Sequence, residues 1–207
     1  MLSGVDGITV MLKKTMQERA DEWELVRPVD SEAEERLRQL ILYLASRCEG
    51  DPAFGATKLN KLLYFADFSS YRQYGKPITG VPYMKLPEGP APVYLVKVRN
   101  EMIQAGDIVL KDALFYRYPQ KRIVAIKNPN LSVFNARDIA LIEWVIRSLR
   151  GHTAREVSDL SHGRAWRIAG DKEHIPYEAS LLMEGDPTEA DAIEAQMLVQ
   201  KYGWTDV

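Results

Sequence analysis

The chain has 207 residues, of which 46% are apolar and 27% are charged, and its formal net charge is −2. This balance is typical of a globular domain with a substantial core. Proteins that bind nucleic acid through its phosphates usually carry an excess of basic residues. The slightly negative net charge therefore argues against nucleic acid as a partner, unless a local basic patch provides the contact. The single cysteine, Cys48, excludes an internal disulfide and a cysteine-based zinc site, and it fits a reducing compartment.

The N-terminal residues do not have the charge order of a secretory signal peptide. No run approaches the roughly 18 apolar residues of a membrane span. We therefore expect a cytoplasmic protein without a membrane partner.

The first elements in chain order are an extension and two helices. Residues 1–30 are predicted to be an N-terminal extension, in which residues 10–25 have the imperfect apolar spacing of a helix. The next helix is expected to begin at Ser31, which has the spacing of a capping box with Glu34. A second helix, capped by Thr57 and ended at Gly75, is apolar around most of its circumference, which predicts a central place in the core.

A loop rich in proline and glycine follows that helix, and a third helix is expected over residues 93–104. Two short β-branched runs, residues 108–110 and 122–126, then predict an antiparallel hairpin or a small sheet. The aromatic and polar residues between the two runs are expected to form the connection.

The last part of the chain is predicted to be helical. Asn135 is expected to cap a helix with a regular apolar stripe, and a short helix is expected over residues 153–160. Residues 187–202 have the pattern of a final acidic helix. The order of elements predicts an α+β fold that is predominantly α-helical, with a small antiparallel β-hairpin or sheet, because strands and helices do not alternate.

No catalytic or cofactor motif is present in the sequence. The phosphate-binding loop, the dinucleotide fingerprint and the nucleophile elbow are all missing. The three histidines, His152, His162 and His174, do not have metal-site spacing, so we expect no metal and no cofactor. We predict a protein that is not an enzyme, with a hydrolase using His162 as the alternative.

Two features leave nucleic-acid binding open as an alternative. The predicted hairpin carries basic residues among aromatic ones, a combination that can bind nucleic acid. Basic residues also protect an edge strand from pairing with other chains, and we favour this second interpretation. Residues 153–160 have the spacing of the first helix of a helix-turn-helix, but Gly163 and Gly170 interrupt the segment that would read bases. The hairpin residues concerned are Phe115, Tyr116, Arg117, Tyr118, Lys121, Arg122 and Lys127.

An ordered set of short motifs identifies a family. The set consists of K-L-N-K-L-L-Y-F-A-D at residues 58–67, G-K-P-I-T-G at 75–80, Tyr83, Gly89-Pro90, L-S-H at 160–162 and Trp166. This set resembles the Panacea domain, also called the SocA-like antitoxin domain, over roughly residues 35–170. We assign residues 31–207 to this domain, including the acidic C-terminal helix, and residues 1–30 to the extension.

The resemblance implies the antitoxin of a two-gene toxin–antitoxin system, which neutralises a cognate toxin by direct protein–protein binding. Related genes occur on prophages, and SocA itself delivers its toxin to the ClpXP protease. A proteolytic adaptor for an AAA+ protease and a DNA-binding autorepressor are therefore alternatives. A homo-oligomer is a further candidate assembly.

The residues after the signature helix are the expected contact surface. The core is assigned Leu59, Leu62, Leu63 and either Phe65 or Ala66. Lys61 and Tyr64 are expected to be partly exposed. Tyrosine and arginine are frequent in interface hot spots. The predicted partner-binding residues are Tyr71, Arg72, Tyr74, Tyr83, Lys85, Pro90, Tyr94, His162 and Trp166.

Overall fold

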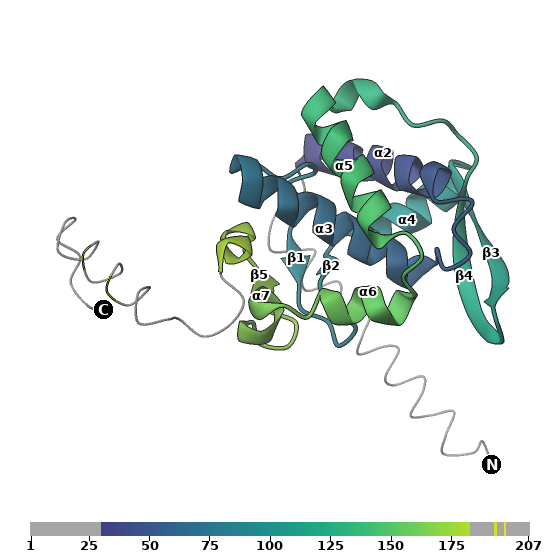
Figure 1. Cartoon of the computed structure of the whole chain (residues 1–207). Helices are drawn as coiled ribbons and strands as arrows, with labels where there is room; N and C mark the ends of the chain where they lie inside the picture. The colour runs from purple at the N-terminus through teal and green to yellow at the C-terminus, as the bar shows by residue number, and fades with distance from the viewer. Residues whose placement is uncertain (1–29, 183–192, 194–196, 198–207) are drawn as a thin grey trace, which may run out of the picture.

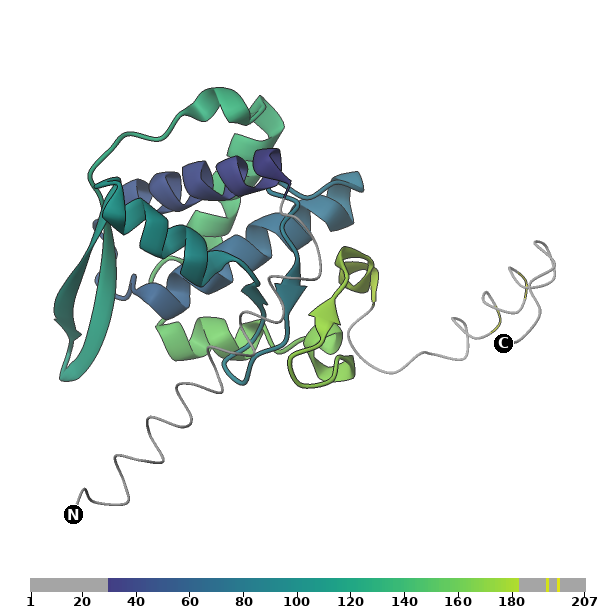
Figure 2. The ribbon, with the colours of Figure 1, turned by 180° about the vertical axis from the view of Figure 1, so that it is seen from behind.

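Helix α3 (Ala56–Tyr74) lies at the centre of the molecule, as Figure 1 shows. The computed structural model describes residues 30–182, 193 and 197. Helix α5 (Ala136–Leu149) crosses α3 on one side, and α2 (Ser31–Arg47) lies between α3 and α4 (Leu95–Gln104) on the other (Figures 1 and 2). The α+β, predominantly helical fold is confirmed.

The starts of α2 and α3 differ from the prediction. Asp30 caps α2 by accepting a hydrogen bond from the backbone N–H of Glu32 at 3.0 Å, so the capping box of Ser31 and Glu34 is wrong. Helix α3 begins after Gly55, where a Cβ would lie 2.9 Å from the Gln120 side chain, and Thr57 lies inside its first turn. The extended backbone that a cap requires occurs one residue before the predicted cap in α2, at Asp30, and two residues before it in α3, at Gly55.

The loop after α3 contributes two strands to a small sheet. Strand β1 (Tyr83–Met84) pairs with β2 (Ala91–Pro92) and with β5 (His174–Ile175), both antiparallel. Since residues 91–92 are extended in this sheet, α4 begins at Leu95, two residues later than predicted.

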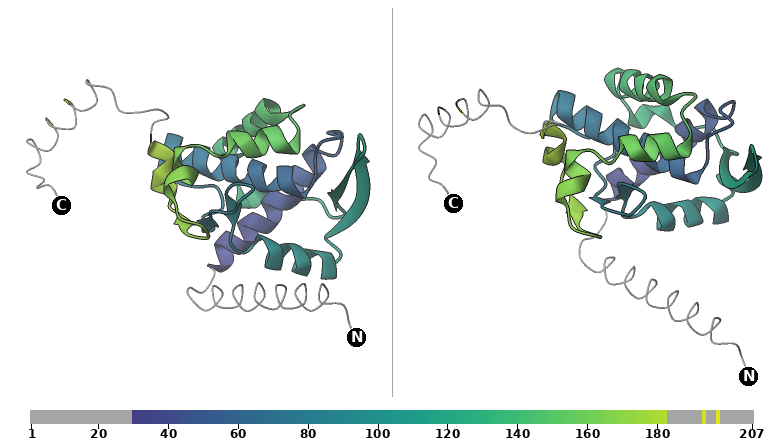
Figure 3. Two further views of the ribbon diagram at one scale, coloured as in Figure 1. Left: turned by 90° about the horizontal axis from the view of Figure 1, so that it is seen from below. Right: turned by 60° about the horizontal axis from the view of Figure 1, so that its bottom comes forward.

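The predicted hairpin is confirmed and is longer than the β-branched runs indicated. Strands β3 (Ile108–Phe115) and β4 (Tyr118–Ala125) pair along their whole length. Buried Ile108 and Ile123 hold its base on the helices, and the tip extends from one end of the molecule, as Figure 3 shows.

Short helices complete the described chain. Asn135 and Asp138 form the capping box of α5, and Thr153 and Glu156 form that of α6 (Ala154–Leu160). The remaining short elements are η1 (Leu131–Val133), α7 (Arg164–Ile168) and η2 (Tyr177–Leu181). With five residues, α7 is too short to be the recognition helix of a helix-turn-helix.

Two predicted terminal helices and the expected lack of a membrane-spanning segment remain to be compared with the structure. The helices predicted over residues 10–25 and 187–202 lie outside the described residues, apart from positions 193 and 197. Within the described part of the chain, no helix is long and apolar enough to cross a membrane.

Candidate partner-binding site

Lys58, in the first turn of α3, has a buried ammonium group that joins three segments. Its Nζ lies 2.6 Å from Oδ2 of Asp51, in the turn before α3, and donates to the backbone carbonyl of His152 at 2.7 Å. His152 lies between α5 and α6, so this one side chain fixes both turns to the start of α3.

Lys61, one turn later, is also buried, contrary to the expected partial exposure. Its Nζ donates to the carbonyl of Pro90 at 3.1 Å, and burial lowers the pKa of the Lys61 ammonium to about 8. At Gly89, which has φ +99°, a Cβ would lie 2.3 Å from Oγ of Ser161 and 2.6 Å from Nζ of Lys61. The K-L-L-Y-F, G-P and L-S-H motifs therefore meet at one point in the interior.

Asp67, in the middle of α3, is fully buried and organises the following loop. Its carboxylate accepts hydrogen bonds from the Thr79 N–H at 2.6 Å, the Thr79 hydroxyl at 2.5 Å and the Tyr83 hydroxyl at 2.9 Å. Burial raises the pKa of Asp67 to about 6, and these hydrogen bonds oppose that increase. The motif residues from the helix to Tyr83 thus act on one another inside the protein.

Three of the predicted partner-binding residues form a cluster around Trp166. The His162 ring stacks on the Trp166 ring with centroids 4.0 Å apart, and Nζ of Lys85 lies 4.5 Å from the Trp166 ring. Trp166 Nε1 donates to the Leu86 carbonyl at 2.9 Å, and Lys85 Nζ donates to the Ala169 carbonyl at 2.7 Å. The cluster fixes the loop after β1 to α7.

Three further predicted residues, Tyr83, Pro90 and Tyr94, are buried in the described chain. Tyr83 donates its hydroxyl to Asp67, and Pro90 receives the hydrogen bond of Lys61. A partner cannot reach these side chains while the chain holds this conformation.

The remaining predicted residues, Tyr71, Arg72 and Tyr74, lie at the accessible end of α3. Tyr71 stacks on Tyr177 with centroids 5.7 Å apart, and the Arg137 guanidinium lies 4.7 Å from the Tyr74 ring. Arg72 is exposed and forms no hydrogen bond or ion pair with the described residues. Among the nine predicted residues, Arg72 is thus an exposed cation whose side chain contributes no polar contact to the described fold.

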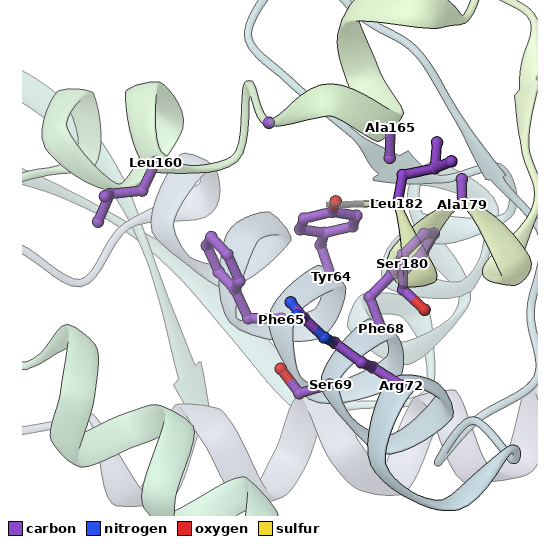
Figure 4. A pocket seen from close by; sticks show the side chains of 11 residues that line it. Tyr64, Phe65, Phe68, Ser69, Arg72, Leu160, Ala165, Ala179, Ser180 and Leu182 are labelled. Carbon is purple, nitrogen blue, oxygen red and sulfur yellow. The ribbon is translucent and has the colours of Figure 1, made fainter. Parts of the chain in front are cut away.

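A pocket of about 150 Å³ lies beside Arg72, as Figure 4 shows. A stripe of α3, formed by the partly buried Phe65 and Ser69 and the exposed Arg72 at helical spacing, forms one side. The end of α6, the start of α7 and the residues around η2 form the other side. The complete lining is Tyr64, Phe65, Phe68, Ser69, Arg72, Leu160, Gly163, Ala165, Ala179, Ser180 and Leu182.

Sequence reasoning did not find this pocket. Phe65 was assigned to the core as an apolar residue of α3, and in the structure it is partly buried. Leu160, 55% exposed, approaches the same pocket from α6, about a hundred residues later in the chain. The available signal is the mixed stripe of Phe65, Ser69 and Arg72, which combines an aromatic ring with a cation on one side of the helix.

The hairpin tip is a second exposed apolar surface. Leu114, Tyr116 and Tyr118 are each more than 60% exposed there. Several basic residues of the hairpin have partners within the protein. Lys121 pairs with Asp112 at 2.5 Å, and Arg122 donates to backbone carbonyls after α2. These contacts favour the interpretation of a charge-protected strand.

The comparison with protein families identifies the chain. Residues 59–167 match the family model described as "Antitoxin SocA-like, Panacea domain", which covers more than half of the chain. The chain belongs to the SocA-like Panacea family. No curated protein and no solved structure matches it.

The matched range divides the pocket of this Panacea domain into two parts. The α3 stripe, Leu160, Gly163 and Ala165 lie inside the range. Ala179, Ser180 and Leu182 lie beyond its end at residue 167. One wall of the pocket is therefore built by residues outside the match.

The pKa values of Cys48 and His162 are both shifted toward the neutral form of the side chain. Burial raises the pKa of the Cys48 thiol to about 11, which disfavours the thiolate. Burial also lowers the pKa of His162, with the Lys61 charge as a smaller cause. No group of three or more histidine, cysteine, aspartate or glutamate residues that could hold a metal occurs in the part that the structure describes.

Proposed function

We propose that the chain is the antitoxin of a toxin–antitoxin pair and neutralises its toxin by direct protein–protein binding, without catalysis. Membership of an antitoxin-like family supports an antitoxin role in general and a toxin as the partner. The observation that supports the direct-binding mechanism is the accessible side of α3, where Arg72, which has no partner among the described residues, adjoins a pocket with Phe65, Leu160 and Leu182 in its lining. Arginine beside apolar surface is typical of interface hot spots.

The buried positions of the polar residues in the signature helix support the same proposal. Lys58, Lys61 and Asp67 are buried, and each is hydrogen-bonded to another segment of the chain. Their role is to hold the domain together, and the accessible side of α3 remains available for contact with another protein.

Co-expression with the product of the adjacent gene tests the proposal. We expect that product to stop growth when it is expressed alone, growth to resume when the full chain is co-expressed, and the two proteins to co-purify. A harmless gene product, or rescue without a complex between the purified proteins, would contradict direct neutralisation.

The same experiment in cells that lack the ClpXP protease separates inhibition from delivery to a protease. Direct inhibition predicts equal rescue with and without the protease, together with an unchanged half-life of the toxin. Rescue that requires the protease would instead favour an adaptor.

A further inference from the structure

We propose that the pocket beside α3 receives one aromatic or branched apolar side chain of the toxin, next to a toxin carboxylate that pairs with Arg72. This inference rests on the proposed antitoxin function. It adds the chemistry of the contact and the residues that form it.

The size and lining of the pocket indicate the apolar group. A volume of about 150 Å³ is enough for one benzene-sized group, and the pocket has about that volume. It is open to solvent, and its apolar side chains stand beside the polar groups of Ser69, Arg72 and Ser180. The Phe65 and Tyr64 rings lie in the middle of the pocket, and Leu160 and Leu182, both exposed, stand at its two opposite ends (Figure 4). A phenylalanine, leucine or isoleucine side chain therefore matches the space, whereas a folded surface larger than one side chain does not enter.

The charge of the pocket indicates the group beside that side chain. Arg72 is the one charged residue of the lining, no acidic residue lines the pocket, and Arg72 has no partner among the described residues. Figure 4 shows its guanidinium end directed toward the side where Phe65 and Tyr64 lie. A guanidinium binds a carboxylate through two parallel hydrogen bonds, and such pairs strengthen where water is displaced.

A second polar group supports an oxygen-bearing ligand. Ser180 lines the same pocket, and its Oγ is buried without a hydrogen-bond partner in the described structure. Buried hydroxyl groups almost always have a partner. Rotation of the Ser180 side chain toward the pocket would let its hydroxyl donate to an oxygen of the ligand. Because Ser180 and Leu182 lie beyond the family match, this wall is where binding to one particular toxin would be determined.

The test measures the dissociation constant of the purified full chain with the product of the adjacent gene. We expect Arg72→Glu and Leu160→Asp to weaken the complex at least tenfold each. Arg155→Glu and Leu131→Asp are matched controls, because both side chains are exposed and neither lines the pocket. The controls should change the dissociation constant less than twofold, and all four variants should keep the wild-type melting temperature.

The outcomes separate this inference from the proposed function. A wild-type complex that Arg72→Glu and Leu160→Asp leave unchanged would overturn the pocket as the contact and leave the antitoxin function standing. Absence of any wild-type complex would overturn both. Tighter binding by the two pocket variants would overturn the inference by assigning the pocket to the chain's own acidic residues after Leu182.

A small-molecule pair tests the pocket chemistry without the toxin. We expect 3-phenylpropanoate to shift the amide NMR signals of Ser69, Arg72 and Ser180 in the full chain, and the uncharged 3-phenylpropanamide to bind at least fivefold more weakly. Arg72→Glu should remove the preference for the acid. Equal binding of the two compounds, or no binding of either, would contradict the assignment of an apolar group next to a carboxylate.

Discussion

Asp67 is an ionisable side chain without access to water, held by three hydrogen bonds from Thr79 and Tyr83. An aspartate in an unfolded chain has a pKa of about 3.9, whereas burial raises the pKa of Asp67 to about 6 in the folded protein. Between these values the folded state binds more protons than the unfolded state. The stability that protonated Asp67 contributes is therefore complete below about pH 4 and is lost as the pH rises through 6.

Asp67→Asn tests this pH dependence, because the amide keeps the shape and does not ionise. The free energy of unfolding of the wild type minus that of the variant should fall by about 3 kcal/mol between about pH 4 and pH 7. Urea unfolding at several pH values measures it. Asp171→Asn, at an exposed position, serves as the control. A difference that does not change with pH would show that Asp67 does not titrate in this range.

The backbone at Gly89 leaves no space for a side chain, because Ser161 and Lys61 pack against it. Gly89→Ala would place a methyl group at φ +99° against Ser161 and Lys61, so we expect a loss of about 2–5 kcal/mol of unfolding free energy. Gly75→Ala is the matched control, since its φ is +68° but a Cβ there meets nothing within 4 Å. It should cost about 1 kcal/mol. Equal losses in chemical denaturation would mean that the close contact at Gly89 has no effect.

Residue environments were the part that sequence patterns predicted least well. Lys61 and Tyr64 were expected to be partly exposed because of their polar groups, yet both are buried. The hydrogen-bond acceptor of Lys61 is the Pro90 carbonyl, 29 positions away in the chain. Helical periodicity indicates which side of a helix is polar, but it contains no information on a distant loop that covers that side.

At the scale of elements, Lys58 connects the start of α3 to the turns around Asp51 and His152. Lys58→Met would leave the Asp51 carboxylate without its buried partner, so we expect a loss of about 3–5 kcal/mol of unfolding free energy. The double variant that adds Asp51→Asn should be more stable than Lys58→Met alone, because no unpaired charge remains. Thermal and urea unfolding of the wild type and the two variants measure this. A loss below about 1 kcal/mol in Lys58→Met would contradict the role of the pair.

Most elements could be predicted, and the errors have local causes. Apolar periodicity identified α2, α3 and α5, and the β-branched runs identified the hairpin. The runs underestimated β3 and β4 because their outer residues face water on both sides, where strand pairing does not require apolar side chains. The strands β1, β2 and β5 have two residues each and depend on pairing across the fold, so no periodicity could indicate them.

At the scale of the whole molecule, the pocket exists only because α3, α6 and the residues around η2 meet. Leu160 and Leu182 line the same pocket as Phe65 from positions 95 and 117 residues later in the chain, and neither carries a local signal of binding. The family motifs were recognisable in the sequence for another reason, since their buried contacts restrict which residues can occupy them. Recognition of the family and location of the contact surface therefore depend on different residues.

The most direct test of this separation is a substitution scan of residues 56–95 and 154–182 in the full chain, with protein abundance and rescue from the toxin measured for every variant. We predict that substitutions at Lys58, Lys61, Asp67 and Gly89 lower abundance and rescue together, whereas those at Arg72, Leu160 and Leu182 abolish rescue at normal abundance. Full rescue by the pocket variants, with loss of rescue at normal abundance arising only at positions outside the pocket, would contradict the account.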